Sequence, residues 1–283
     1  MLLRILLLRV AGHLVVLYSA YSAHNGRYLF PEDIGLWCAF GYHLPMSANG
    51  NQRLVSLVPS VTETLVAWGV DPIACTRFCE QPTFMHIGGT KDPDIDAIVK
   101  LKPDLVIMDR EENRQEDYLN LVEAGVEVEA VHVASLSDVS SEIGRLALRL
   151  QIDWSFETPE ALPDSAASNR YRAFVPIWKR PWMTIGQLTY GASVLRYLGV
   201  EVEFSDRGVS YPVVEDLEIR SASLDFVLAP TEPYPFGARH LDMLSDFAPA
   251  YLIDGQDLFW WGSRTADALE RLRMQIDEIV CGE

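Results

Sequence analysis

Short apolar runs alternate with amphipathic segments along the chain from Leu54 onward. Apolar runs of four to eight residues bounded by Gly, Pro or polar residues are typical of buried strands, and apolar residues spaced by three and four are typical of helices. The pattern predicts strands over 54–58, 73–76, 105–108, 126–133, 173–178, 200–204, 226–229 and 251–254. It predicts helices over 62–68, 95–101, 111–123, 137–150, 190–198, 217–220, 238–247 and 264–280.

This alternation indicates an α/β fold with parallel sheets covered by helices on both faces. The stretches 102–107 (KPDLVI) and 223–228 (SLDFVL) occupy equivalent places 121 residues apart, so we expect two similar lobes. The predicted division is an N-terminal lobe over 46–135, a connecting helix and linker over 136–172, and a C-terminal lobe over 173–283.

A ligand site is expected between these lobes, because ligands of α/β proteins usually lie in the crevice outside the carboxyl ends of the strands. The loops after the predicted strands are rich in aromatic residues beside Pro and Gly. They include 77–78 (RF), 178–182 (WKRPW), 211–212 (YP), 234–236 (YPF) and 259–261 (FWW). Three or four such rings stacked on a flat ligand would contribute on the order of 10 kcal/mol before association costs. We therefore expect a binding site that needs no covalent chemistry.

The net charge of −17 narrows the possible partners. With 49% apolar residues the chain has enough material for a sizeable core. A surface this acidic repels phosphate backbones, so nucleic acid and anionic lipid surfaces are poor partners. A neutral or cationic ligand, or a basic protein surface, fits better.

Residues 1–45 differ from the rest, with a net charge of +1 against −18 for the remainder. A basic and apolar start, an apolar stretch to Ala20 and small residues at Ala20 and Ser22 are typical of a secretory signal. The stretch is too short to span a membrane. Alternatively, translation begins at Met46, just before the first strand, and 1–45 is an upstream extension. The first interpretation predicts an extracytoplasmic protein and the second a cytoplasmic one.

Motifs for catalysis are missing from the sequence: there is no G-x-S-x-G, P-loop, H-E-x-x-H or strand-linked G-x-G-x-x-G. Four cysteines do not make a disulfide framework in a chain this long, and the close pair Cys75 and Cys79 is expected to be buried near a strand end. His86, His132 and His240 lie far apart in sequence, so no metal site is expected. We predict a binding protein rather than an enzyme.

Four segments, 53–65, 76–82, 87–90 and 98–106, resemble the N-terminal lobe of the substrate-binding proteins of vitamin B12 and ferric-siderophore ABC importers. Residues 181–186 (PWMTIG) and 261–264 (WGSR) resemble that family's second lobe, most like its cobalamin-binding branch. The resemblance implies two Rossmann-like lobes joined by a connecting helix, the class III periplasmic-binding fold. It also implies a metal chelate bound between the lobes, with no intrinsic cofactor.

The resemblance also implies roles for individual residues in ligand contact and in docking. Phe78, Thr90 and Tyr211 fall where relatives place ring-contacting side chains, and Asp96 matches the acid that meets a basic permease loop. The second docking acid would fall at Leu217, with Glu218 beside it, so this part of the docking pattern departs from the family's.

The sequence thus predicts a monomer that binds a corrinoid and delivers it to ABC permease subunits. The expected ligand-binding residues are Arg77, Phe78, Thr90, Trp182, Tyr211, Tyr234, Trp260, Trp261 and Arg264. A ferric siderophore or haem is the alternative ligand, and its anionic groups would favour Arg77, Arg180 and Arg264 over the aromatic rings. An alternative of another class is a cytoplasmic metal-chelate carrier or chelatase-like enzyme.

Overall fold

A computed structural model describes residues 3–10, 13–20, 52–157 and 171–282. The chain forms two compact units, residues 1–49 and 50–283. In the first, β1 (Leu3–Val10) and β2 (His13–Ala20) pair as an antiparallel hairpin. The position Ser22 of the expected signal cleavage and the linker prolines Pro159 and Pro163 lie outside the described residues.

The N-terminal lobe is built on a five-stranded parallel sheet in the order β5-β4-β3-β6-β7. Its strands are β3 (Leu54–Ser56), β4 (Ala74–Cys75), β5 (Met85–His86), β6 (Leu105–Asp109) and β7 (Val128–Val131). Its helices are α1 (Pro59–Ala67), α2 (Ile95–Leu101) and α3 (Gln115–Glu123). Every residue of β3 and β6 is buried, which explains why these strands are continuous apolar runs rather than alternating ones.

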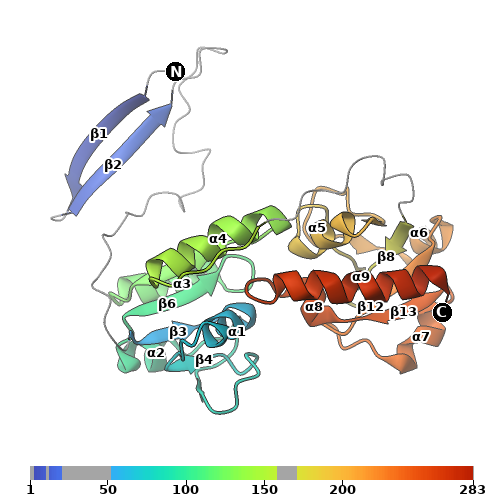
Figure 1. The fold of residues 1–283 in the computed structure, drawn as a ribbon, viewed down its shortest axis with the longest axis horizontal. Helices are drawn as coiled ribbons and strands as arrows, with labels where there is room; N and C mark the ends of the chain where they lie inside the picture. The colour runs from blue at the N-terminus through green and yellow to red at the C-terminus, as the bar shows by residue number, and fades with distance from the viewer. Residues whose placement is uncertain (1–2, 11–12, 21–51, 158–170, 283) are drawn as a thin grey trace. The chain divides into compact units, whose positions relative to one another are not determined.

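The C-terminal lobe holds a four-stranded parallel sheet in the order β10-β8-β12-β13. Figure 1 labels β8, β12 and β13 of this sheet. Its strands are β8 (Tyr171–Phe174), β10 (Val200–Val202), β12 (Phe226–Pro230) and β13 (Ala250–Ile253), with a separate antiparallel pair of β9 (Trp182–Met183) and β11 (Val213–Val214). Its helices are α5 (Tyr190–Tyr197), α6 (Asp216–Ser221), α7 (Ala238–Leu244), α8 (Gly255–Phe259) and α9 (Thr265–Cys281). Two parallel sheets with helices confirm the predicted α/β fold class.

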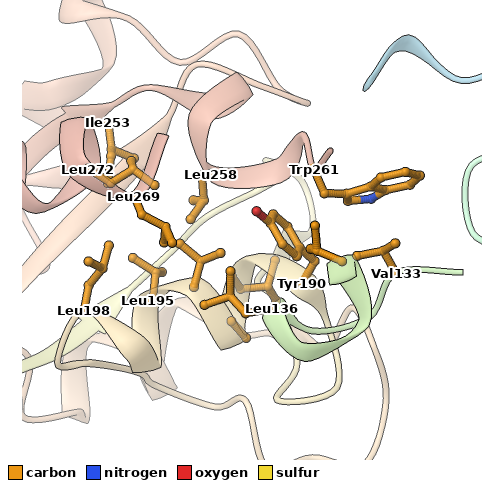
Figure 2. Packing of buried hydrophobic residues seen from close by; sticks show 14 of the residues in the cluster. Val133, Leu136, Tyr190, Leu195, Leu198, Ile253, Leu258, Trp261, Leu269 and Leu272 are labelled. Carbon is orange, nitrogen blue, oxygen red and sulfur yellow. The ribbon is translucent and has the colours of Figure 1, made fainter. Parts of the chain in front are cut away.

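The helix α4 (Leu136–Arg149) links the lobes in sequence, and its inner face is apolar. Val139, Ile143 and Leu146 are fully buried at the spacing that places them on one side of a helix. They belong to one apolar cluster that includes residues of both lobes, from Leu54 to Ile276. Figure 2 shows part of it, where Val133 and Leu136 lie together with Tyr190 and Trp261. The lobes therefore share an apolar core as well as a covalent link.

Two of the differences between the expected elements and the structure have a local cause. The helix expected from Glu111 begins only at Gln115, because the Asp109 carboxylate accepts the backbone N–H groups of Glu111 (2.8 Å) and Glu112 (2.9 Å) and holds them in a turn. The segment expected as an aromatic loop at 259–261 begins inside the short helix α8, which ends at Phe259 and whose first turn is capped by Asp254 accepting the N–H of Asp257 at 3.0 Å. Local side-chain acceptors decide both differences.

The described residues include no helix that is long and apolar enough to cross a membrane. The lobe boundaries given above stay predictions.

Candidate functional site

Loops that follow the strands of the two sheets meet at the boundary between the lobes. Gln256 of α8 donates its side-chain amide to the Glu80 carboxylate, which follows β4, at 2.8 Å. The Tyr211 hydroxyl donates to Glu111, which follows β6. Arg264, just before α9, lies 2.8 Å from a carboxylate oxygen of Glu63 in α1. These contacts bring the carboxyl ends of both sheets together, where the fold is expected to bind ligand.

Three aromatic side chains on these loops remain open to solvent. Phe78 is 51% exposed, Trp178 47% and Tyr211 40%. Phe78 follows β4, Trp178 follows β8, and Tyr211 lies in the connection from β10 to β11. Isolated exposed rings are unremarkable, but rings from both lobes beside cross-lobe contacts are suited to stacking on a flat ligand.

Two further rings of the C-terminal lobe were expected to contact the ligand. Tyr234, after β12, packs edge-on against Trp178 with ring centroids 5.5 Å apart. Trp260 is half-buried, and its indole N–H donates to Glu232 at 3.1 Å. Trp178 itself was not among the expected ligand-binding residues. Its position at the end of the first predicted strand of the C-terminal lobe is the feature of the sequence that indicates a place in the binding site.

Trp182 and Trp261 lie in the core instead of on an open surface. Trp182 is 8% exposed, and its indole N–H donates to Asp216 at 2.8 Å. Its ring packs edge-on against Phe174 and Phe247, because pairing of β9 with β11 directs it inward. Trp261 is 6% exposed and belongs to the shared apolar cluster. We therefore leave both out of the candidate site.

Both arginines expected to orient the ligand are already paired with carboxylates. Both terminal nitrogens of Arg77 donate to the Asp92 carboxylate in a bidentate interaction, with N–O distances of 3.0 to 3.2 Å. The Arg77 guanidinium lies 4.7 Å from the Phe78 ring centroid. Arg264 lies 2.8 Å from Glu63 and 3.4 Å from Asp257. Each guanidinium group therefore already has a carboxylate partner before any anionic ligand binds.

The backbone carbonyl of Thr90, another expected contact, accepts the Asn113 side-chain amide at 2.9 Å. This bond joins the loop after β5 to the loop after β6. Thr90 is half-buried, so the structure places it at the edge of the N-terminal lobe's strand-end loops.

Several carboxylates lie at the same boundary between the lobes and shift one another's pKa. Burial raises the pKa of Glu232, and the charges of Glu80 and Asp254 raise it further. Glu112 keeps contact with solvent, yet protein surrounds its carboxyl on most sides. This burial, together with the charge of Asp109, raises the pKa of Glu112 to about 7. The sequence pattern does not indicate this acidic character, because it predicts Glu111 and Glu112 as the first residues of a helix over 111–123.

The cysteine pair is buried, as expected, at the end of β4. The Cys79 thiol contacts the Thr62 hydroxyl at 3.2 Å and the Thr76 hydroxyl at 3.1 Å. A hydrogen bond from Cys75, with those from the two threonines, lowers the pKa of Cys79 to about 6. Within the described ranges, no three His, Cys, Asp or Glu side chains are placed to hold a metal ion.

The expected docking residues are on the surface. Asp96 is exposed in the first turn of α2. Glu218 of α6 pairs with Arg207 at 2.7 Å, and its pKa is lowered mainly by the Glu215 backbone N–H and then by Arg207. Leu217, where the family's acid would fall, is 75% exposed.

A separate hollow of about 450 Å³ lies beside α5 and β10. Its lining includes Gln187, Arg196, Glu201 and Asp206, and none of the expected ligand-binding residues. It is mostly polar and offers no aromatic wall, so the strand-end loops remain the better candidate for a flat ligand.

Comparison with known proteins finds similar sequences and similar folds. Residues 54–150 match the family model described as periplasmic binding protein. The vitamin B12-binding protein of Pectobacterium carotovorum subsp. carotovorum (strain PC1) is 26% identical over 196 residues, which cover 63% of this chain and 69% of the relative. That of Salmonella paratyphi A is 26% identical over 190 residues, covering 60% and 69%.

Solved structures share the fold at lower identity. The periplasmic vitamin B12 binding protein of Vibrio cholerae superposes with a TM-score of 0.65 at 20% identity, covering 80% of this chain and 96% of its own. The periplasmic heme-binding protein of Roseiflexus sp. RS-1 superposes with a TM-score of 0.63 at 20% identity, covering 80% and 97%. Residues 54–150 are thus similar to the periplasmic binding protein family, and about 80% of the chain shares the fold of these solved structures.

Proposed function

We propose that this protein binds a corrinoid, without chemical conversion, at the strand-end loops between its two lobes. The relatives whose names specify vitamin B12 binding are similar over about 190 to 200 residues and support this ligand class. The V. cholerae vitamin B12 binding protein, which shares the fold, also supports it.

The observation that carries the proposal is the group of exposed rings Phe78, Trp178 and Tyr211, contributed by both lobes. Each aromatic side chain can remove roughly 150 to 250 Å² from water, and about 25 cal/mol is gained per Å². Three half-covered rings therefore contribute several kcal/mol. Together with ligand contacts to backbone and amide groups, this is enough for affinity in the micromolar range after association costs.

Titration of the purified protein with cyanocobalamin, followed by quenching of tryptophan fluorescence, tests the proposal. We expect saturable binding that weakens about tenfold or more in Trp178→Ala. The matched control is Leu148→Ala, which removes an exposed apolar side chain from α4 and should leave the affinity unchanged. Equal affinity in Trp178→Ala and the unchanged protein would remove the aromatic loops from the site.

Haem or a ferric siderophore is the second ligand candidate, because solved heme-binding proteins share the fold. The pairing of Arg77 with Asp92, and of Arg264 with Glu63 and Asp257, favours the corrinoid. Parallel titrations with haemin and a ferric catecholate decide between the candidates. Binding of either in preference to cyanocobalamin would reverse this assignment.

Delivery to an ABC importer is the role we propose for the loaded protein, with Asp96 and Glu218 as acidic contacts for basic permease loops. This role requires export to the periplasm or cell envelope. Cell fractionation tests it. Recovery of the protein only from the cytoplasm would favour an intracellular chelate carrier or a chelatase-like enzyme instead.

A further inference from the structure

Two carboxylates from opposite lobes meet on a single side-chain amide at the proposed site. The Gln256 amide nitrogen donates to Glu80 at 2.8 Å and to Glu232 at 3.3 Å. Glu80 follows β4 in the N-terminal lobe, and Glu232 follows β12 in the C-terminal lobe. The second oxygen of Glu232 accepts the Trp260 indole N–H at 3.1 Å. Neutral N–H donors, rather than cations, thus hold this pair of acids.

More acceptors lie on the adjoining loop after β6. Glu111 accepts the Tyr211 hydroxyl, and Glu112 is close enough to Glu232 for their charges to interact. Lys91 opposes this charge, but its ammonium group already donates to the Glu111 backbone carbonyl at 2.5 Å. The loops from both lobes therefore present carboxylate oxygens to whatever binds between them.

The guanidinium groups of Arg77 and Arg264 do not offset these acids for an incoming anion. Arg77 is engaged by Asp92 and Arg264 by Glu63 and Asp257. A ligand carboxylate would have to displace one of these partners and then lie near Glu80 and Glu232. Like charges brought together in a partly desolvated site are strongly unfavourable, and proteins use such repulsion to reject wrong ligands.

We infer that the site selects chelates whose periphery carries primary amides and rejects chelates of the same shape that carry carboxylates, with Glu80 and Glu232 as the selecting acceptors. A ligand amide offers the same N–H donor as Gln256, so it can replace that contact and keep the exposed Glu80 and the half-buried Glu232 paired. This inference rests on the proposed function and specifies the substrate class of that site.

The test compares two corrinoids that differ only in the groups at the ring edge. Isothermal titration at pH 7.5 measures the affinity of dicyanocobinamide, with amide side chains, and of dicyanocobyrinic acid, with carboxylates in their place. We expect the amide form to bind at least about tenfold more tightly. In Glu80→Gln and Glu232→Gln the ratio should fall severalfold, because each substitution removes one repelling charge. In the control Glu270→Gln, an exposed acid on α9, the ratio should not change.

The outcomes separate the two proposals. Equal binding of both corrinoids, or a ratio unchanged in Glu80→Gln and Glu232→Gln, overturns the inference and leaves corrinoid binding intact. Binding of neither corrinoid by a protein with a normal circular dichroism spectrum overturns the proposed function, and the inference falls with it. A preference for the carboxylate form would also contradict the inference and would support an anionic ligand.

Discussion

Thr64 of the N-terminal lobe and Gly262 of the C-terminal lobe lie against each other so closely that no side chain fits between them. A Cβ atom on Gly262 would sit 2.1 Å from the Thr64 hydroxyl oxygen. The same hydroxyl accepts the backbone N–H of Ser263 at 3.1 Å and donates to the Ser60 carbonyl at 2.9 Å. This contact joins α1 to the turn before α9 and helps to fix how the lobes meet.

Gly262→Ala should destabilise the protein by about 2 kcal/mol or more. The new methyl group would clash with Thr64, and the φ of 122° at this position is unfavourable for any residue with a Cβ. Urea unfolding measures the change. The control is Gly144→Ala in α4, where a Cβ meets nothing within 4 Å; there alanine should stabilise by about 0.5 to 1 kcal/mol. Equal effects at the two positions would contradict the tight contact.

Asp257→Asn should cost about 3 kcal/mol, because it removes a buried charge that holds two guanidinium groups. Asp257 is almost fully buried, accepts two hydrogen bonds from Arg271 at 2.7 Å each, and lies 3.4 Å from Arg264. Chemical denaturation of the variant measures the loss. Asp267→Asn, at an exposed position on α9, should change stability by less than about 0.5 kcal/mol. A similarly small loss in Asp257→Asn would show that the network does not stabilise α8 against α9.

Glu112 should make stability depend on pH. Its folded-state pKa of about 7 lies above the usual 4.5, so the folded protein favours the protonated carboxyl. The charged carboxylate therefore lowers the free energy of unfolding. This loss of stability is absent below about pH 4.5, grows as pH rises and is fully present above about pH 7. Glu112→Gln removes it. Because the side chain is partly exposed, we expect a gain of only about 1 kcal/mol at pH 8 and none at pH 4.5.

Thermal unfolding of Glu112→Gln and the unchanged protein at both pH values checks this prediction. Glu123→Gln, at an exposed position at the end of α3, serves as the control. A gain of the same size at pH 4.5 and pH 8 would have a cause other than the Glu112 charge.

Trp182→Phe separates a structural tryptophan from a ligand-contacting one. The substitution removes the hydrogen bond to Asp216 and part of the packing against Phe174, so stability should fall by about 1 to 2 kcal/mol. Affinity for cyanocobalamin should stay within about twofold. A large loss of affinity with unchanged stability would show that Trp182 contacts the ligand, as the sequence pattern predicts.

The sequence pattern predicts the central strands and the longer helices well, since their burial is decided by the residues themselves. Leu105 to Met108 is apolar throughout because both faces of β6 are covered, and α2 begins and ends where its capping residue Asp94 and the following Lys102 and Pro103 indicate. The two-residue strands β5, β9 and β11 have no such signal, because their pairing depends on distant partners.

The candidate site is harder to predict for a related reason. Aromatic residues beside proline suggest exposed rings, and Phe78 and Tyr211 are indeed open to solvent. Trp182 has the same local sequence character but is buried, because it pairs with Val214 of β11, which lies 32 residues further along the chain. Gln256 has no distinguishing motif, and its importance arises only where Glu80, 176 residues away, meets it.

Isothermal titration of the purified protein with cyanocobalamin is the most direct test of the central claim. We expect one ligand per chain with a dissociation constant of about 1 μM or below. No detectable heat and no change in tryptophan fluorescence at about 100 μM ligand, with a protein that unfolds cooperatively, would contradict it.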